Sequence, residues 1–219
     1  MSTLIADPTR GLFMGNRGCL HDAGGQIVRP FRGRLWITCL TDFKGRRRTL
    51  MQPGRYTELI FLDEAVALSA GHRPCAECRR TAYRSFRAAW AKANLPSCTL
   101  ADDMDRHLHT SRLTGRQQRH DVARAQGLPD GAFALGPDGQ PLLIAGAQAL
   151  PYTPAGYGPP VPRPRGPVTV LTPAPILAVL TAGYPALLHP SAQVSIAPNM
   201  SRPDAPRLVR RAFLPPEAP

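Results

Sequence analysis

The chain has 219 residues, 43% of them hydrophobic, which is enough for a folded core and excludes a wholly disordered protein. No apolar run approaches the roughly 18–20 residues of a membrane span, and the first residues lack the apolar core of a signal peptide. Five cysteines are too few, and odd in number, for a disulfide-stapled secreted domain. We therefore expect a cytoplasmic protein with free thiols.

The charge of the chain is strongly positive and unevenly distributed. Lys and Arg number 27 against 15 Asp and Glu, a formal net charge of +12. Residues 1–92 contain 16 basic and 7 acidic side chains and so carry +9 of that charge. Such an excess favours polyanionic partners, of which nucleic acid is the default, and we expect the partner to bind the first part of the chain.

Short strands followed by helices are predicted before residue 95. Segments 26–31 and 34–40 are apolar, β-branched and aromatic, and the Arg-Gly-Arg between them predicts a hairpin. Residues 56–62 predict a third strand. Asp63 can cap a helix that ends at Gly71, and a second helix with one apolar stripe follows, whose aromatic residues we expect in the core.

The remainder of the chain alternates between polar and apolar segments. Residues 99–124 are polar and predict two helices interrupted at Gly115. Pro-Asp-Gly recurs between short apolar runs over 128–152, the pattern of hairpin turns in a small β unit. A strand and a helix are predicted over 168–184.

A Cys-x-x-Cys pair, Cys75 and Cys78, lies in "AGHRPCAECRR" between the two N-terminal helices. Two thiolates at this spacing can chelate a tetrahedral zinc ion, but the site needs further ligands. Cys39 at the end of a predicted strand is one candidate, and His21 or Cys19 in "NRGCLHD" could supply the fourth. Two other interpretations stay open, a redox pair and a pair of small buried hydrophobes; a thioredoxin-like redox motif, however, would follow a strand and open a helix.

The stretch "FLDEAVALSAGHRPCAECRR", residues 61–80, resembles the segment that closes the zinc site in the metal-binding domain of the bacterial Ada DNA-repair protein. There, a short helix runs into Gly-aromatic-Arg-Pro-Cys-x-x-Cys; here a histidine replaces the aromatic. The resemblance implies Cys75 and Cys78 as zinc ligands, Cys39 as a third, and a role in DNA repair. In that family a Cys-x-x-x-Cys loop supplies the other two cysteines, and a zinc-bound thiolate accepts a methyl group from DNA. Because Phe43 stands at the second of these positions, methyl transfer is kept only as an alternative.

Two hypotheses for function follow from the charged residues. In the first hypothesis, a zinc site stabilises a basic surface that can contact successive phosphates of a nucleic acid. The resemblance favours DNA over RNA as that nucleic acid. We expect this surface to consist of Arg29, Arg32, Arg34, Arg46, Arg47, Arg48 and Arg55. The rival hypothesis is a metal-dependent nuclease or phosphodiesterase in the middle segment. Its candidate residues are His107, His109, His120 and Asp121, with Asp102, Asp103 and Asp105 at or near the start of the segment.

The predicted fold class is α+β, with three parts. Residues 1–95 form an Ada-like basic module, in which zinc stabilises a β-hairpin and helix. Residues 99–190 form a second small α+β unit of unknown role. Residues 191–219 are rich in Pro and Arg and predict a disordered tail.

Overall fold

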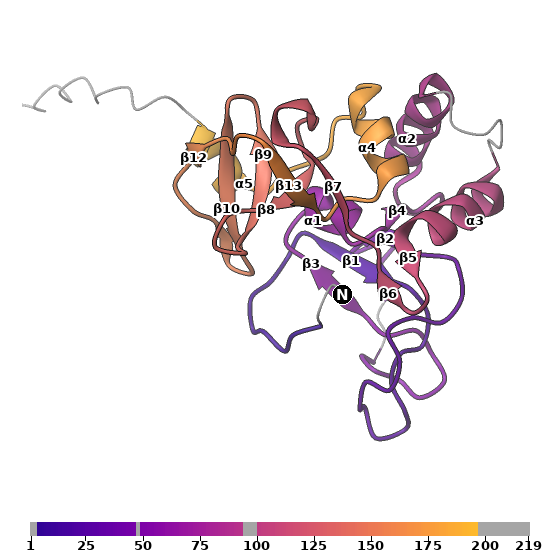
Figure 1. Ribbon diagram of the computed structural model, residues 1–219. Coiled ribbons are helices and arrows are strands. Elements are labelled where there is room, and N and C mark those ends of the chain that lie inside the picture. Colours follow the sequence, from indigo (N-terminus) through magenta and orange to yellow (C-terminus); the bar gives the residue numbers. More distant parts are fainter. Residues whose placement is uncertain (1–3, 47–48, 94–99, 197–219) are drawn as a thin grey trace, which may run out of the picture.

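The computed structural model describes residues 4–46, 49–93 and 100–196 and has the predicted α+β fold (Figure 1). Two β-sheets lie on either side of a short helix, α1, and three longer helices, α2, α3 and α4, lie together at one end of the molecule. The helices are α1 Glu64–Ser69, α2 Arg80–Lys92, α3 Ala101–Arg112, α4 Ala174–Thr181 and α5 Pro190–Ile196.

The smaller sheet has four strands in the order β3-β1-β2-β4. Their bounds are β1 Phe13–Asn16, β2 Ile37–Leu40, β3 Leu59–Phe61 and β4 Arg73–Pro74. β1 is antiparallel to both β2 and β3, whereas β4 pairs parallel to β2, with Thr38 opposite Pro74. The parallel pair brings the chain that follows α1 next to β2.

The predicted hairpin between 26–31 and 34–40 is wrong, because β2 pairs with β1 and β4 and not with residues 26–31. Ile27 and Val28 are 47% and 51% exposed; Ile27 forms an isolated bridge with His21, and Val28 N donates to Leu20 O at 2.9 Å. The sequence of β1 contains Gly15, which weakens any prediction of a strand. That glycine is required by packing, since a Cβ atom there would lie 2.2 Å from the ring of Phe61.

The larger sheet has the order β11-β10-β9-β8-β13-β7, with β12 paired to β10. β8, β9 and β10 form consecutive antiparallel hairpins. The Pro-Asp-Gly at 137–139 forms the turn between β8 and β9 as predicted, whereas the Pro-Asp-Gly at 129–131 precedes β8 and the β9–β10 turn lies at Gly146 and Ala147. The bounds are β7 Asp121–Arg124, β8 Phe133–Leu135, β9 Pro141–Ala145, β10 Gln148–Thr153, β11 Gly156–Tyr157, β12 Val161–Pro162 and β13 Pro167–Val170. A short 3-10 helix, η1 Ala125–Gly127, follows β7.

The second of the two helices predicted within 99–124 is absent. α3 ends at Arg112, and the chain then forms a small two-stranded sheet of β5 Leu113–Thr114 and β6 Gln117–Gln118, turning at Gly115 with φ +61°. β7 then pairs with β13 at the edge of the larger sheet, and its Val122 is 72% exposed. Backbone pairing determines this strand, which has too little buried apolar surface to show a pattern in the sequence.

Helix α1 connects the two sheets. Asp63 caps it as predicted, accepting a hydrogen bond from Val66 N at 2.9 Å. Ala65 packs against the larger sheet, Ala67 against the smaller sheet, and Leu68 against the helices, all of them fully buried. A six-residue helix buried on all sides in this way needs tertiary packing to be stable.

The segments before and after residue 95 share one hydrophobic core. Phe86 and Trp90 of α2 are fully buried in the same cluster as Met104 and Leu108 of α3, which confirms the core role of these two aromatics. The predicted disordered tail begins at residue 191, but residues 191–196 belong to helix α5, in which Ala192 is buried. Residues 197–219 of that prediction lie outside the described residues. Within the described part of the chain, no helix is both long and apolar enough to cross a bilayer.

Candidate metal centre

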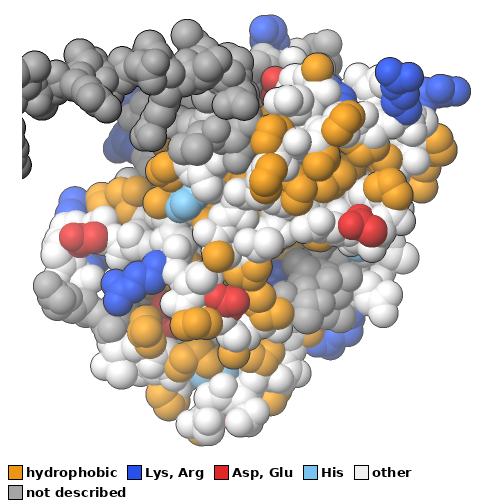
Figure 2. Space-filling view, turned by 90° about the vertical axis from the view of Figure 1, so that its left-hand side faces the viewer, with side chains coloured by type: hydrophobic (Ala, Val, Ile, Leu, Met, Phe, Trp, Pro, Cys, Tyr) orange, Lys and Arg blue, Asp and Glu red, His pale blue; other side chains and the backbone are white. Residues whose placement is uncertain are grey.

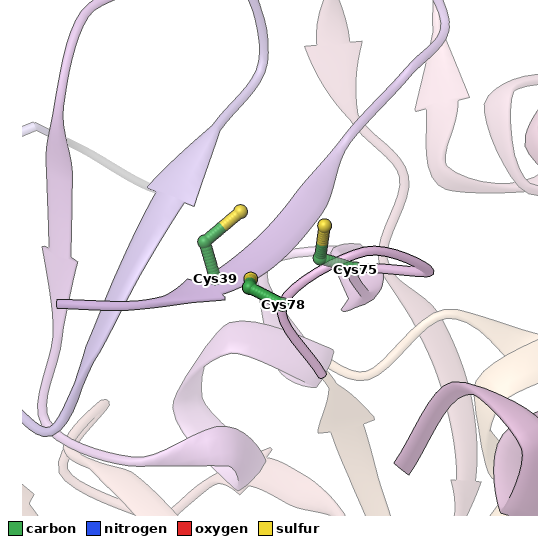
Figure 3. A group of neighbouring side chains, drawn as sticks. All are labelled: Cys39, Cys75 and Cys78. Carbon is green, nitrogen blue, oxygen red and sulfur yellow. The ribbon is translucent and has the colours of Figure 1, made fainter. Parts of the chain in front are cut away.

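Three cysteine thiols come together beside the smaller sheet. Cys39 lies in β2, Cys75 directly follows β4, and Cys78 lies two residues before α2. Their Sγ atoms all lie within 4.8 Å of one another, and Figure 3 shows the thiols of Cys39 and Cys75 pointing to the same side, with Cys78 next to them. Among the described residues, no other group of three His, Cys, Asp or Glu side chains is this close. The group could therefore hold a metal ion.

Backbone hydrogen bonds determine how these thiols are arranged. Cys75 N donates to Thr38 O at 3.0 Å, which extends the parallel pairing of β2 and β4 by one residue and places Cys75 beside Cys39. The turn to Cys78 is closed by Arg79 N, which donates to Cys75 O at 3.2 Å. Two backbone N–H groups point at sulfur: Glu77 N at 3.4 Å from Cys75 Sγ, and Leu40 N at 3.4 Å from Cys78 Sγ. N–H groups aimed at sulfur stabilise a thiolate.

The three thiols affect one another's ionisation. A hydrogen bond from the Cys39 thiol, supported by the N–H groups of Glu77 and Cys78, lowers the pKa of Cys75 to about 5 despite its burial. The same hydrogen bond, together with burial, raises the pKa of Cys39. Burial raises the pKa of Cys78. Cys75 is therefore the thiol of the three that ionises most readily, and a divalent cation would replace the protons of the thiols that bind it.

The residues predicted as a fourth ligand do not join this group. Cys19 Sγ donates to His21 O at 3.4 Å. His21 Nδ1 lies 2.6 Å from Thr57 Oγ1, and its Nε2 lies 3.3 Å from Gln52 O. The His21 side chain holds the loop between β1 and β2 against the loop that precedes β3, whereas the Cys19 hydrogen bond lies within the first of these loops. We expected these residues near the cysteines because the sequence predicted a hairpin between 26–31 and 34–40, and that hairpin does not form.

A buried ion pair supports the turn that carries Cys78. Arg79, the next residue, lies 2.8 Å from Glu64 of α1, and its guanidinium stacks over the ring of Phe13 at 4.1 Å. Glu64 also accepts a hydrogen bond from Tyr184 OH at 2.6 Å. Since the ion pair is almost fully buried, loss of one partner would leave an uncompensated charge next to the cysteine turn.

The predicted arginine surface is only partly present. Arg32, Arg34, Arg46 and Arg55 are exposed and Arg29 is half-buried, while Arg47 and Arg48 lie outside the described residues. Two of the exposed arginines already have acidic neighbours: Arg46 lies 2.8 Å from Glu77 and Arg34 lies 3.7 Å from Asp102. On the face drawn in Figure 2, Lys and Arg side chains are scattered among Asp and Glu and form no single patch of described residues.

Part of the positive charge is internal, which sequence reasoning missed. Among the described residues, four arginines are at least nine-tenths buried, namely Arg17, Arg73, Arg79 and Arg112. Arg73 forms a bidentate pair with Asp105, at 2.8 and 2.6 Å. The guanidinium of Arg112 lies 3.8 Å from the ring centre of Trp36 and donates to two backbone carbonyls. No pattern in the sequence distinguishes these arginines from the exposed ones.

The candidate nuclease residues lie apart. His107 packs edge-on against Trp90, with ring centres 5.6 Å apart, whereas His109 contacts Phe31 at 5.3 Å. Both are in α3, but His120 and Asp121 are exposed at the start of β7. Within the described part of the chain these groups form no cluster of three that could share a metal ion.

No family model matches the chain, and neither a curated protein nor a solved structure shows significant similarity to it. The resemblance of residues 61–80 to the Ada metal-binding domain therefore stays a prediction. The structure adds one observation at the position where that family has its other cysteine: Phe43 is half-buried there, with Lys44 and Arg46 over its ring at 5.2 and 5.3 Å.

Proposed function

We propose that the protein binds a zinc ion through Cys39, Cys75 and Cys78. The observation that carries this proposal is the grouping of three thiols within 4.8 Å, with backbone N–H groups directed at two of the sulfurs. Thiolates are preferred ligands of zinc. Because these residues provide three ligands, the fourth position is left to water or to a ligand from outside the described residues.

We propose further that the zinc site stabilises a part of the chain that binds nucleic acid. The excess of positive charge in residues 1–92 supports this, as do the exposed side chains of Arg32 and Arg55. Guanidinium groups on folded loops contact phosphates without regard to sequence, so binding weakens steeply as salt is added. DNA as the nucleic acid, and a role in its repair, rest on the Ada resemblance.

Zinc content tests the first proposal. We expect elemental analysis of the purified protein to give one zinc per chain, and Cys75→Ser and Cys39→Ser to lose it. Cys19→Ser is the matched control, because Cys19 is a buried thiol outside the group of three. Circular dichroism would show whether each variant folds. A folded Cys75→Ser protein that retains zinc would exclude this site.

Salt dependence tests the second proposal. We expect a fluorescent DNA duplex to bind with a log–log salt slope that falls by about 0.9 when Arg32→Ala or Arg55→Ala removes one phosphate contact. Arg165→Ala, an exposed arginine in the second half of the chain, should leave the slope unchanged. Equal slopes in all four proteins would show that these loops do not contact phosphate.

The two alternative activities differ in their support. The nuclease hypothesis receives none from the described residues, because its histidines are not grouped. An Ada-like methyl acceptor remains a proposal that rests on the resemblance, with Cys39 the candidate thiol. Incubation with methylated DNA would then add one methyl group to Cys39 in a single turnover, which intact-protein and peptide mass spectrometry would detect. An unchanged mass would exclude it.

A further inference from the structure

An aromatic cluster lies where the loop before β2 meets α3. We call Phe31, Trp36 and His109 the aromatic corner. The ring centre of Phe31 is 5.5 Å from that of Trp36 and 5.3 Å from that of His109. Trp36 is only 4% exposed, whereas Phe31 and His109 are half-buried. Trp36 is therefore the buried member of the corner, and Phe31 and His109 are partly exposed.

Two buried arginines place positive charge against the Trp36 ring of the aromatic corner. The Arg112 guanidinium, 3.8 Å from the Trp36 ring, also contacts His109 Nδ1 at 3.2 Å. Arg17 stacks near the same ring at 5.0 Å. Arg112 makes no ion pair among the described residues, since the nearby acid Asp105 is paired with Arg73. Burial, followed by the charges of Arg112 and Arg34, lowers the pKa of His109, so its ring is neutral at pH 7.

Exposed arginines form the rim of the corner. Arg32 and Arg34 flank the loop segment that follows Phe31, and both are exposed. The ion pair from Arg34 to Asp102 is long, at 3.7 Å, and its partners are 51% and 70% exposed. A pair of this kind contributes little stability, so a phosphate could replace the carboxylate.

The loop that carries Phe31 is held in place before any ligand binds. Arg32 N donates to Arg17 O at 2.9 Å, and Trp36 Nε1 donates to Gly33 O at 3.2 Å. Arg112 donates to Arg34 O at 2.6 Å from α3. A ligand would therefore bind without the entropy cost of ordering this loop.

We propose that the aromatic corner stacks an unpaired base of a nucleic acid strand, with Arg32 and Arg34 on the flanking phosphates. This inference rests on the proposed nucleic-acid binding and narrows it to single-stranded segments. Aromatic rings beside arginines on a folded surface provide both contacts that single strands need, a π face for the base and cations for the backbone. In a duplex the faces of the bases are covered by their neighbours in the stack, so the corner discriminates against it.

The experiment compares a fluorescent fifteen-nucleotide oligothymidylate with a duplex of equal length, using the full chain and fluorescence anisotropy. We expect Phe31→Leu, which keeps an apolar side chain but removes the π face, to weaken single-strand binding about tenfold. Phe31→Tyr should restore it, and duplex binding should not change in either variant. Phe43→Leu is the matched control, because Phe43 is also half-buried but has two cations over its ring.

The possible outcomes separate this inference from the broader proposal. Duplex binding with no tighter single-strand binding, or equal losses for Phe31→Leu and Phe43→Leu, would overturn the stacking role and leave nucleic-acid binding in place. Absence of salt-sensitive binding to either probe would overturn both. Oligodeoxyuridylate and oligouridylate of the same length differ only in the sugar: tighter binding of the oligouridylate would support stacking and replace DNA by RNA as the partner.

Discussion

Replacing the fully buried His72 by phenylalanine should make the protein less sensitive to acid. His72 is 0% exposed and lies between the rings of Trp36 at 5.4 Å and Phe61 at 4.8 Å. Neither ring nitrogen makes a well-formed hydrogen bond to the described residues. Burial, and then the nearby charges of Arg17 and Arg112, place the pKa of His72 well below its ordinary value of 6.5.

The magnitude follows from proton linkage. A histidine in the unfolded chain takes up a proton below pH 6.5, but the buried His72 does not, so acid favours the unfolded state. The stability that depends on a neutral His72 is fully present above pH 6.5 and falls by about 1.4 kcal/mol for each pH unit well below it. Between pH 7.5 and pH 5.0 the loss is about 2 kcal/mol.

Urea unfolding followed by circular dichroism would measure this effect. The free energy of unfolding of His72→Phe, minus that of the unaltered protein, should rise by about 2 kcal/mol from pH 7.5 to pH 5.0 at matched zinc content. Phenylalanine is a suitable replacement because the surrounding rings require no hydrogen bond. His107→Phe, at a half-exposed site, is the control. Parallel pH profiles for His72→Phe and the unaltered protein would refute the reasoning.

Three further substitutions test the buried contacts. Asp105→Asn breaks the buried pair with Arg73 and should cost about 3–5 kcal/mol in the free energy of unfolding, measured in urea; a loss below 1 kcal/mol would contradict it. Asp63→Ala removes the acceptor for Val66 N and Tyr157 OH and should cost about 2 kcal/mol or more, seen as faster amide exchange in α1. Gly71→Ala forces a side chain into φ +81° and should lower stability by about 1–2 kcal/mol, visible as a lower melting temperature.

Local signals predicted the elements in which neighbouring residues suffice. The cap at Asp63 and the stop at Gly71 bound α1 as predicted, and the second Pro-Asp-Gly marked the β8–β9 hairpin of the larger sheet. These signals act through hydrogen bonds and backbone angles within a few residues. The sequence did not predict strands β1 and β7, because neither has a recognisable apolar pattern. β1 contains Gly15, and β7 is an exposed strand at the edge of the larger sheet.

The candidate site shows the same division. The sequence alone determined the excess of basic residues and the Cys75–Cys78 pair, because composition and a two-residue spacing are properties of the chain itself. Only the tertiary structure decided that Cys39 lies beside Cys75 and that Cys19 and His21 lie elsewhere. It also decided which arginines are buried and which are exposed. The physical reason is strand pairing: the register of β2 against β4 depends on packing between segments more than thirty residues apart, which no local pattern records.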